Sequence, residues 1–160
     1  MACKMTRGQD LGLVTGKSRG YNTLTPEIMF VYGTLRKDTV SPMAHIIDDY
    51  CELIGEAYIH GSLYDLGRYP GVLVGAEHQA KVYGQLFRLK DQTKVLTEFD
   101  YYEECSDDFP KPHLYIRQAV DVYGDEAAPR QGWVYVYNRS VENASLIPGG
   151  DYLEYLNSQP

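Results

Sequence analysis

The stretch Phe30–Arg36 changes character halfway along. Its first half belongs to the apolar run Ile28–Tyr32, whose β-branched and aromatic residues favour a buried strand. The run stops at Gly33, and a hydroxyl residue, Thr34, and a basic residue, Arg36, follow. A strand that ends at glycine can point successive backbone N–H groups into one concavity and form a small anion-binding nest. An ordinary strand-to-loop turn would contain the same residue types, so the motif alone leaves both interpretations open.

The rest of the chain alternates between strand-like and helix-like patterns. Strands are predicted over residues 28–32, 51–66, 72–74, 82–89, 115–123 and 132–137. Helices are predicted after Ser41 and from Asp91 to about Glu104, with a further short element at residues 151–156. Glycines at positions 55 and 61 permit bulges or bends in the long second strand. Many strands with two main helices predict an α+β domain with a curved-sheet or small β-barrel core.

The second predicted helix aims one carboxyl at its apolar side. Its apolar residues share one stripe at helical spacing: Val95, Leu96, Phe99 and Tyr102. Glu103 falls inside that stripe, Glu98 lies at its edge, and Asp100 and Glu104 project toward solvent. Burial raises the pKa of a carboxyl and makes it a better proton acceptor near neutral pH. A structural ion pair with Arg36 or Arg117, or a frayed helix end, would also accommodate Glu103, so its role stays open.

Residues 1–26 differ in composition from the rest. They carry four basic residues and one acidic residue and are rich in glycine, threonine and serine, without sustained periodicity. We therefore expect a disordered basic extension over 1–26 and a single folded domain over 27–160. Organelle targeting is an alternative role for the extension, and Met29 is an alternative natural start.

Composition argues against several classes of protein. The net charge of −7 disfavours binding to nucleic acid or to an anionic membrane surface. The three cysteines (Cys3, Cys51 and Cys105) have no CxxC spacing, which fits a reducing compartment, and we expect a cytoplasmic protein. A cysteine nucleophile is an alternative that no nearby histidine supports. The four histidines are scattered, so no metal site is predicted.

Several motifs together resemble the gamma-glutamyl cyclotransferase superfamily, and within it the gamma-glutamylamine cyclotransferase branch. The motifs occur in the family's order over about residues 28–156: Phe30–Arg36, Tyr69-Pro70-Gly71, Val82-Tyr83-Gly84, Phe99-Asp100-Tyr101-Tyr102-Glu103, Tyr115-Ile116-Arg117 and Trp133–Tyr137. The sequence departs from the family pattern at Phe99, where leucine is usual, and in a longer acidic loop over residues 105–114. The second departure affects the expected pocket for the leaving amine more than the chemistry.

The resemblance implies a reaction and a set of site residues. The substrate's own α-amine attacks its γ-carbonyl, which gives 5-oxoproline and a free amine without any cofactor. By position Glu103 is the expected general base. The candidate substrate-binding residues are Tyr32, Gly33, Thr34, Leu35, Arg36, Tyr69, Tyr115 and Arg117, with Tyr137 as a further lining candidate. The backbone N–H groups of Tyr32–Leu35 would hold the α-carboxylate or stabilise the oxyanion.

The expected partner is a small-molecule γ-glutamyl substrate, bound by a monomer. Two other roles remain possible for the same fold. One is a small-molecule binding module that keeps the nest but has lost turnover. The other is an interaction protein that recruits a partner through its strand surface and its N-terminal extension. A large exposed apolar patch and the lack of a pocket beside Gly33 would distinguish it.

Overall fold

The structure is a computed structural model that describes residues 25–33, 36 and 41–160. The predicted residues Thr34 and Leu35, and residues 1–24 of the predicted extension, lie outside this set. The described strands are β1 (Ile28–Val31), β2 (Cys51–His60), β3 (Ser62–Asp65), β4 (Pro70–Leu73), β5 (Lys81–Leu89), β6 (Tyr115–Val122), β7 (Arg130–Tyr137) and β8 (Ser145–Leu146). The described helices are α2 (Ala44–Tyr50), α3 (Gln92–Tyr102) and α4 (Tyr152–Ser158).

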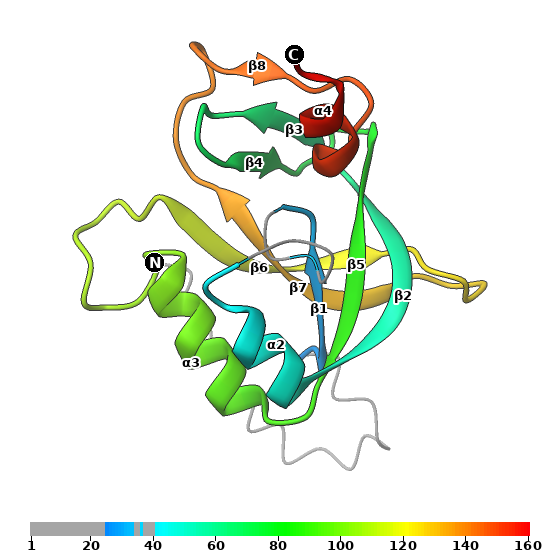
Figure 1. The fold of residues 1–160 in the computed structure, drawn as a ribbon, viewed down its shortest axis with the longest axis vertical. Helices are drawn as coiled ribbons and strands as arrows, with labels where there is room; N and C mark the ends of the chain where they lie inside the picture. Colours follow the sequence, from blue (N-terminus) through cyan, green and yellow to red (C-terminus); the bar gives the residue numbers. More distant parts are fainter. Residues whose placement is uncertain (1–24, 34–35, 37–40) are drawn as a thin grey trace.

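The strands form two sheets, as expected for a mixed α+β domain (Figure 1). A five-stranded sheet has the order β2-β5-β1-β7-β6, in which β1 is antiparallel to β5 and parallel to β7. This sheet curls until its outer strands approach each other. There Tyr58 and Tyr123 exchange two backbone hydrogen bonds of 2.9 Å, which form an isolated bridge. The second sheet, β4-β3-β8, lies at one end with α4, whereas α2 and α3 lie toward the other end.

Strand β1 lies between two hydrophobic cores. Met29 and Val31 pack in a core with residues of α2 and α3, including Ile46 and Phe99. The alternate residues, Ile28 and Phe30 of β1 and Tyr32 just after it, pack in a second core. This core also contains inner residues of β2 to β5. Because successive side chains of a strand point to opposite faces, a strand buried on both faces must be apolar throughout. This explains the apolar run in the sequence.

The predicted strand 51–66 is two strands in different sheets. The chain leaves the large sheet after His60 and enters the small sheet at Ser62, with Gly61 between them. A register shift between Leu53 and Gly55 also changes which face the side chains occupy. Leu53 is therefore exposed, whereas Ala57 and Ile59, which share its parity along the strand, are buried.

Other boundaries differ by a few residues. Asp91 caps α3 as predicted, since its side chain accepts from the backbone N–H of Lys94. Residue Ser41 accepts a hydrogen bond from the Met43 N–H, but regular helix begins only at Ala44. Pro26 is buried and its carbonyl accepts from Gln92, so packing already includes this residue, which was assigned to the extension. The two-residue strand β8 was not predicted.

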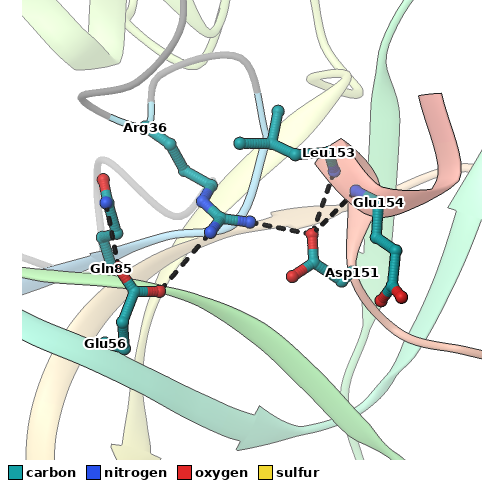
Figure 2. Close-up of polar contacts among 6 residues, drawn as sticks. All are labelled: Arg36, Glu56, Gln85, Asp151, Leu153 and Glu154. Carbon is teal, nitrogen blue, oxygen red and sulfur yellow. Dashed lines mark hydrogen bonds and ion pairs between the residues drawn. The ribbon is translucent and has the colours of Figure 1, made fainter. Parts of the chain in front are cut away.

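Arg36 ties the turn after β1 to the C-terminal helix (Figure 2). Its backbone N–H donates to the Gly33 carbonyl at 3.2 Å. Its guanidinium is buried, donating to Asp151 at 2.9 Å and to the more exposed Glu56 at 3.4 Å. The same Asp151 oxygen accepts from two backbone N–H groups at the start of α4. Asp151 is therefore both the cap of α4 and the partner of a buried cation.

Substitution of Asp151 separates these two roles. Asparagine caps helices well but has no charge, so we expect D151N to lower the free energy of unfolding by about 1–2 kcal/mol through the ion pair. Alanine removes the cap as well, so D151A should cost about 1 kcal/mol more. Denaturant unfolding would measure both changes.

The matched control is Asp91, which caps α3 and is exposed. We expect D91N to be nearly neutral and D91A to cost about 1 kcal/mol. Equal losses for D151N and D91N would show that the Arg36–Asp151 pair adds nothing measurable to stability.

Candidate active site

A pocket of about 240 Å³ opens where β1 ends. Its walls come from the last residues of β1, the start of β4, the C-terminal end of α3, and β6 and β7. The lining residues are Phe30, Val31, Tyr32, Gly33, Tyr69, Pro70, Tyr102, Glu103, Glu104, Leu114, Tyr115 and Tyr135. Walls that are mostly aromatic or aliphatic, with a few polar groups, are typical of a small-molecule site.

Glu103 is placed by the end of α3. It is the C-cap residue, and its backbone N–H donates to the Phe99 carbonyl at 2.8 Å. The residue is partly buried, and it lines the pocket. Within the described residues the Glu103 carboxyl makes no ion pair. The alternative of a salt bridge to Arg36 or Arg117 is not observed, since these arginines pair with Asp151 and Asp100.

The surroundings of Glu103 favour its protonated form. Burial, and to a smaller extent the neighbouring Glu104 carboxylate, together raise the pKa of Glu103 from the usual 4.5 to about 8. Burial also raises the pKa of Tyr32 and of Tyr115, and the charge of Glu103 adds to both shifts. Both phenols therefore stay neutral, and the carboxyl can exchange a proton near physiological pH.

Two of the predicted loop residues are described, and both line the pocket. The Tyr32 hydroxyl donates to the Tyr135 carbonyl at 2.7 Å, which fixes the ring. Gly33 does not have the left-handed backbone of the positive-φ glycines. A Cβ at Gly33 would instead lie 2.8 Å from Cγ of Pro70, so glycine is needed here for close packing. The nest involving Thr34 and Leu35 stays a prediction.

Two more of the predicted tyrosines line the pocket, and another packs against one of them. Tyr69 and Tyr115 line the pocket and meet edge to face at 6.2 Å between ring centres. The Tyr115 hydroxyl donates to the Pro70 carbonyl at 2.6 Å, so this ring is held against β4. Tyr137 packs against Tyr115 at 5.7 Å but is not a lining residue.

Neither predicted arginine lines the pocket. Arg36 is paired with Asp151, as described above. On β6, the Nε atom of Arg117 lies 3.2 Å from Asp100, and its guanidinium stacks over Trp133 at 4.6 Å. The prediction that Asp100 points to solvent is wrong, because its carboxylate also accepts from the Tyr135 hydroxyl at 2.9 Å.

Sequence reasoning missed several lining residues. Tyr102 was placed on the core stripe, whereas it is exposed and lines the pocket. Glu104 is exposed, as predicted, but it also lines the pocket, which was not predicted. Glu104 turns because its backbone leaves helical geometry, with φ of 55°. Pro70 lies within the Tyr69-Pro70-Gly71 motif, of which only Tyr69 was predicted as a site residue. No local pattern distinguishes Leu114 or Tyr135 from ordinary core residues.

The described cysteines and histidines do not contribute to the pocket. Cys51 and Cys105 are buried and do not line it, and burial raises the pKa of the Cys51 thiol to about 11. Cys3 lies outside the described residues. No cluster of three or more histidine, cysteine, aspartate or glutamate side chains suited to a metal ion occurs in residues 25–33, 36 and 41–160.

The family model described as "Gamma-glutamyl cyclotransferase, AIG2-like" matches residues 29–154, which is most of the chain. The protein belongs to this family. The match includes Glu103 and every described residue that lines the pocket.

Relatives of this cyclotransferase family cover the same part of the chain. The "Gamma-glutamylcyclotransferase family protein ytfP" of Citrobacter rodentium is 34% identical over 128 residues, which are 79% of this chain and 95% of the relative. A "Putative gamma-glutamylcyclotransferase" of Vibrio cholerae is 31% identical over 129 residues, covering 79% and 96%.

Solved structures agree with the family's fold. The solution structure of ytfP from Escherichia coli has a TM-score of 0.57 at 29% identity and covers 80% of this chain and 97% of that one. The crystal structure of a mouse AIG2-like protein has a TM-score of 0.57 at 22% identity, covering 73% and 80%, and shows the fold alone. Among the described helices, none has the length and apolar character needed to cross a membrane.

The raised pKa of Glu103 predicts how its replacement affects stability. Between pH 4.5 and about 8 the folded state binds more protons at this carboxyl than the unfolded state, so ionisation destabilises the fold progressively as pH rises. Glutamine does not ionise. We therefore expect the free energy of unfolding of E103Q, relative to the wild type, to increase by about 1–3 kcal/mol from pH 5 to pH 8.5.

Urea unfolding at several pH values would measure this difference, and E98Q is the control. Glu98 is on the same helix, is half-exposed and pairs with Lys94, which lowers the pKa of Glu98. Its effect on stability should not change between pH 5.5 and 8.5. If E103Q gave an equally flat profile, the pKa of Glu103 would not be raised.

Proposed function

We propose that this protein is a cyclotransferase that cleaves a γ-glutamyl amine or amide and releases 5-oxoproline and a free amine. The observation that carries the proposal is the Glu103 carboxyl, which lines the pocket, has a pKa raised to about 8 and pairs with no cation in the described chain. Such a group is a competent proton acceptor near neutral pH. Membership of the family supports the reaction type.

The proposed reaction is an intramolecular acyl transfer. Glu103 takes a proton from the substrate's α-ammonium, and the freed α-nitrogen attacks the γ-carbonyl carbon to close a five-membered ring. The bond between the γ-carbon and the leaving nitrogen then breaks, while Glu103 delivers its proton to that nitrogen. The α-nitrogen loses a second proton as it becomes an amide, and the leaving amine ends as an ammonium ion, so protons and charge balance.

The remaining task of the protein is to orient the substrate. Attack within one molecule needs the amine and the carbonyl to meet in one conformation, which a fixed pocket can impose. We propose that backbone N–H groups of Tyr32–Leu35 hold the α-carboxylate or the oxyanion, and that Tyr69 and Tyr115 pack against the glutamyl chain. Arg36 and Arg117 are left out of this role, because their guanidinium groups pair with other carboxylates. We place the reaction in the cytoplasm, since the odd number of cysteines fits a reducing compartment.

Replacing Glu103 tests the proposal. We expect the purified wild-type protein to release 5-oxoproline from a γ-glutamyl amide, and E103Q to lower kcat by about 10²-fold or more. Because the base must be ionised, kcat/KM of the wild type should rise with pH and level off with an apparent pKa of about 8. Chromatographic quantification of 5-oxoproline would measure both.

E98Q is again the matched control, since this half-exposed carboxyl on α3 does not line the pocket. Turnover of E103Q at the wild-type rate would remove Glu103 as the base. Saturable binding of the substrate without any 5-oxoproline from the wild type would identify a binding module instead.

A further inference from the structure

Glu104 occupies a backbone position that ordinarily takes glycine. Helix α3 ends in a Schellman motif: the Cys105 N–H donates to the Asp100 carbonyl at 2.9 Å, and the Glu104 N–H donates to the Tyr101 carbonyl at 3.1 Å. This places Glu104 in the left-handed region, with φ of 55°. Glycine or asparagine is usual there, because other side chains crowd the backbone. The local geometry therefore does not account for a glutamate.

The side chain of Glu104 lies at the exposed rim of the pocket. Residue 104 is exposed and lines the pocket beside the partly buried Glu103. Among the described lining residues, the charged ones are these two carboxylates, and the others are aromatic, apolar or glycine. Two half-exposed rings, Tyr69 and Tyr102, complete the lining near solvent. The described walls thus combine negative charge with aromatic surface, which suits a cation on an apolar stem.

The chemistry of the substrate determines which part of it can use this charge. Every γ-glutamyl amide has the same α-ammonium and α-carboxylate, so these groups cannot distinguish one substrate from another. The leaving amine is the part whose charge varies. A rim carboxylate next to the proton-transfer residue can therefore act on selectivity only through the leaving group.

We propose that Glu104 is a specificity residue that selects γ-glutamyl amides whose leaving amine carries a second, cationic amino group, as in the monoamide of a linear diamine. This inference rests on the proposed cyclotransferase reaction and adds the charge class of its substrate. The bond changes are those given above. The product that leaves is a diamine with both nitrogens protonated.

Three substrates of equal length test the selection: the γ-glutamyl amides of a linear diamine, of the corresponding monoamine and of the corresponding ω-amino acid. We expect wild-type kcat/KM to favour the cationic over the neutral substrate by about three- to tenfold, and the anionic substrate to be poorest. In E104Q the ratio of cationic to neutral should fall to about one. In E104K the order should reverse in favour of the anionic substrate.

Two further variants separate specificity from structure. Glycine suits the left-handed position, so E104G should raise the melting temperature while abolishing the charge preference. D108N removes a negative charge from the neighbouring loop, where the residue is exposed and does not line the pocket. It should leave the cationic-to-neutral ratio within about twofold of the wild type.

The outcomes distinguish this inference from the reaction on which it rests. If the wild type released 5-oxoproline from none of the three substrates, the proposed function itself would fail. If it released 5-oxoproline but E104Q lowered kcat/KM equally for all three, Glu104 would act on a group common to all substrates, and the selection would be wrong. A charge preference that persisted in both E104Q and E104G would also overturn it.

Discussion

Burial of β1 on both faces is the constraint on which the remaining structure depends. Its neighbours β5 and β7 occupy both edges, one core covers the side of Met29, and another covers the side of Phe30. A strand enclosed in this way cannot shift its register without moving side chains out of both cores. Its end is therefore a fixed point, and the pocket is built at that end, around Tyr32 and Gly33.

Near the pocket, the buried arginines are paired with carboxylates, whereas the carboxyl of Glu103 is not paired with a described arginine. Each buried arginine is matched to a carboxylate outside the lining: Arg36 to Asp151 and Arg117 to Asp100. Glu103 has no ion-pair partner among the described residues, and its pKa is raised by burial first and by the neighbouring Glu104 carboxylate second. The same ion pairs also hold Arg36 after β1 and Asp100 in the C-terminal half of α3, so they support the surroundings of the pocket although none of their members lines it.

The sequence predicted those features that depend on local periodicity. The apolar run of β1, the Asp91 cap and the inward position of Glu103 all follow from the geometry of a single strand or helix. Asp100 was misplaced because its partner, Arg117, comes from a strand that local periodicity cannot bring near. The place of Glu104 at the pocket was not predicted, because the helical rotation of about 100° per residue stops applying once the backbone turns left-handed. A helical wheel describes one regular helix, so it cannot predict contacts with distant segments or the place where the regular geometry ends.

The end of α3 also has a consequence for how a family of such proteins can vary over time. The interval from the Asp91 cap to Glu103 is regular helix, so one inserted or deleted residue would rotate the carboxyl by about 100° and remove it from the pocket. Beyond the left-handed residue the chain continues as the irregular segment 105–114, where insertions disturb no helical phase. Changes in length should therefore accumulate after residue 104 and be eliminated before it, so that the loop can diverge while the position of Glu103 in the pocket is inherited unchanged.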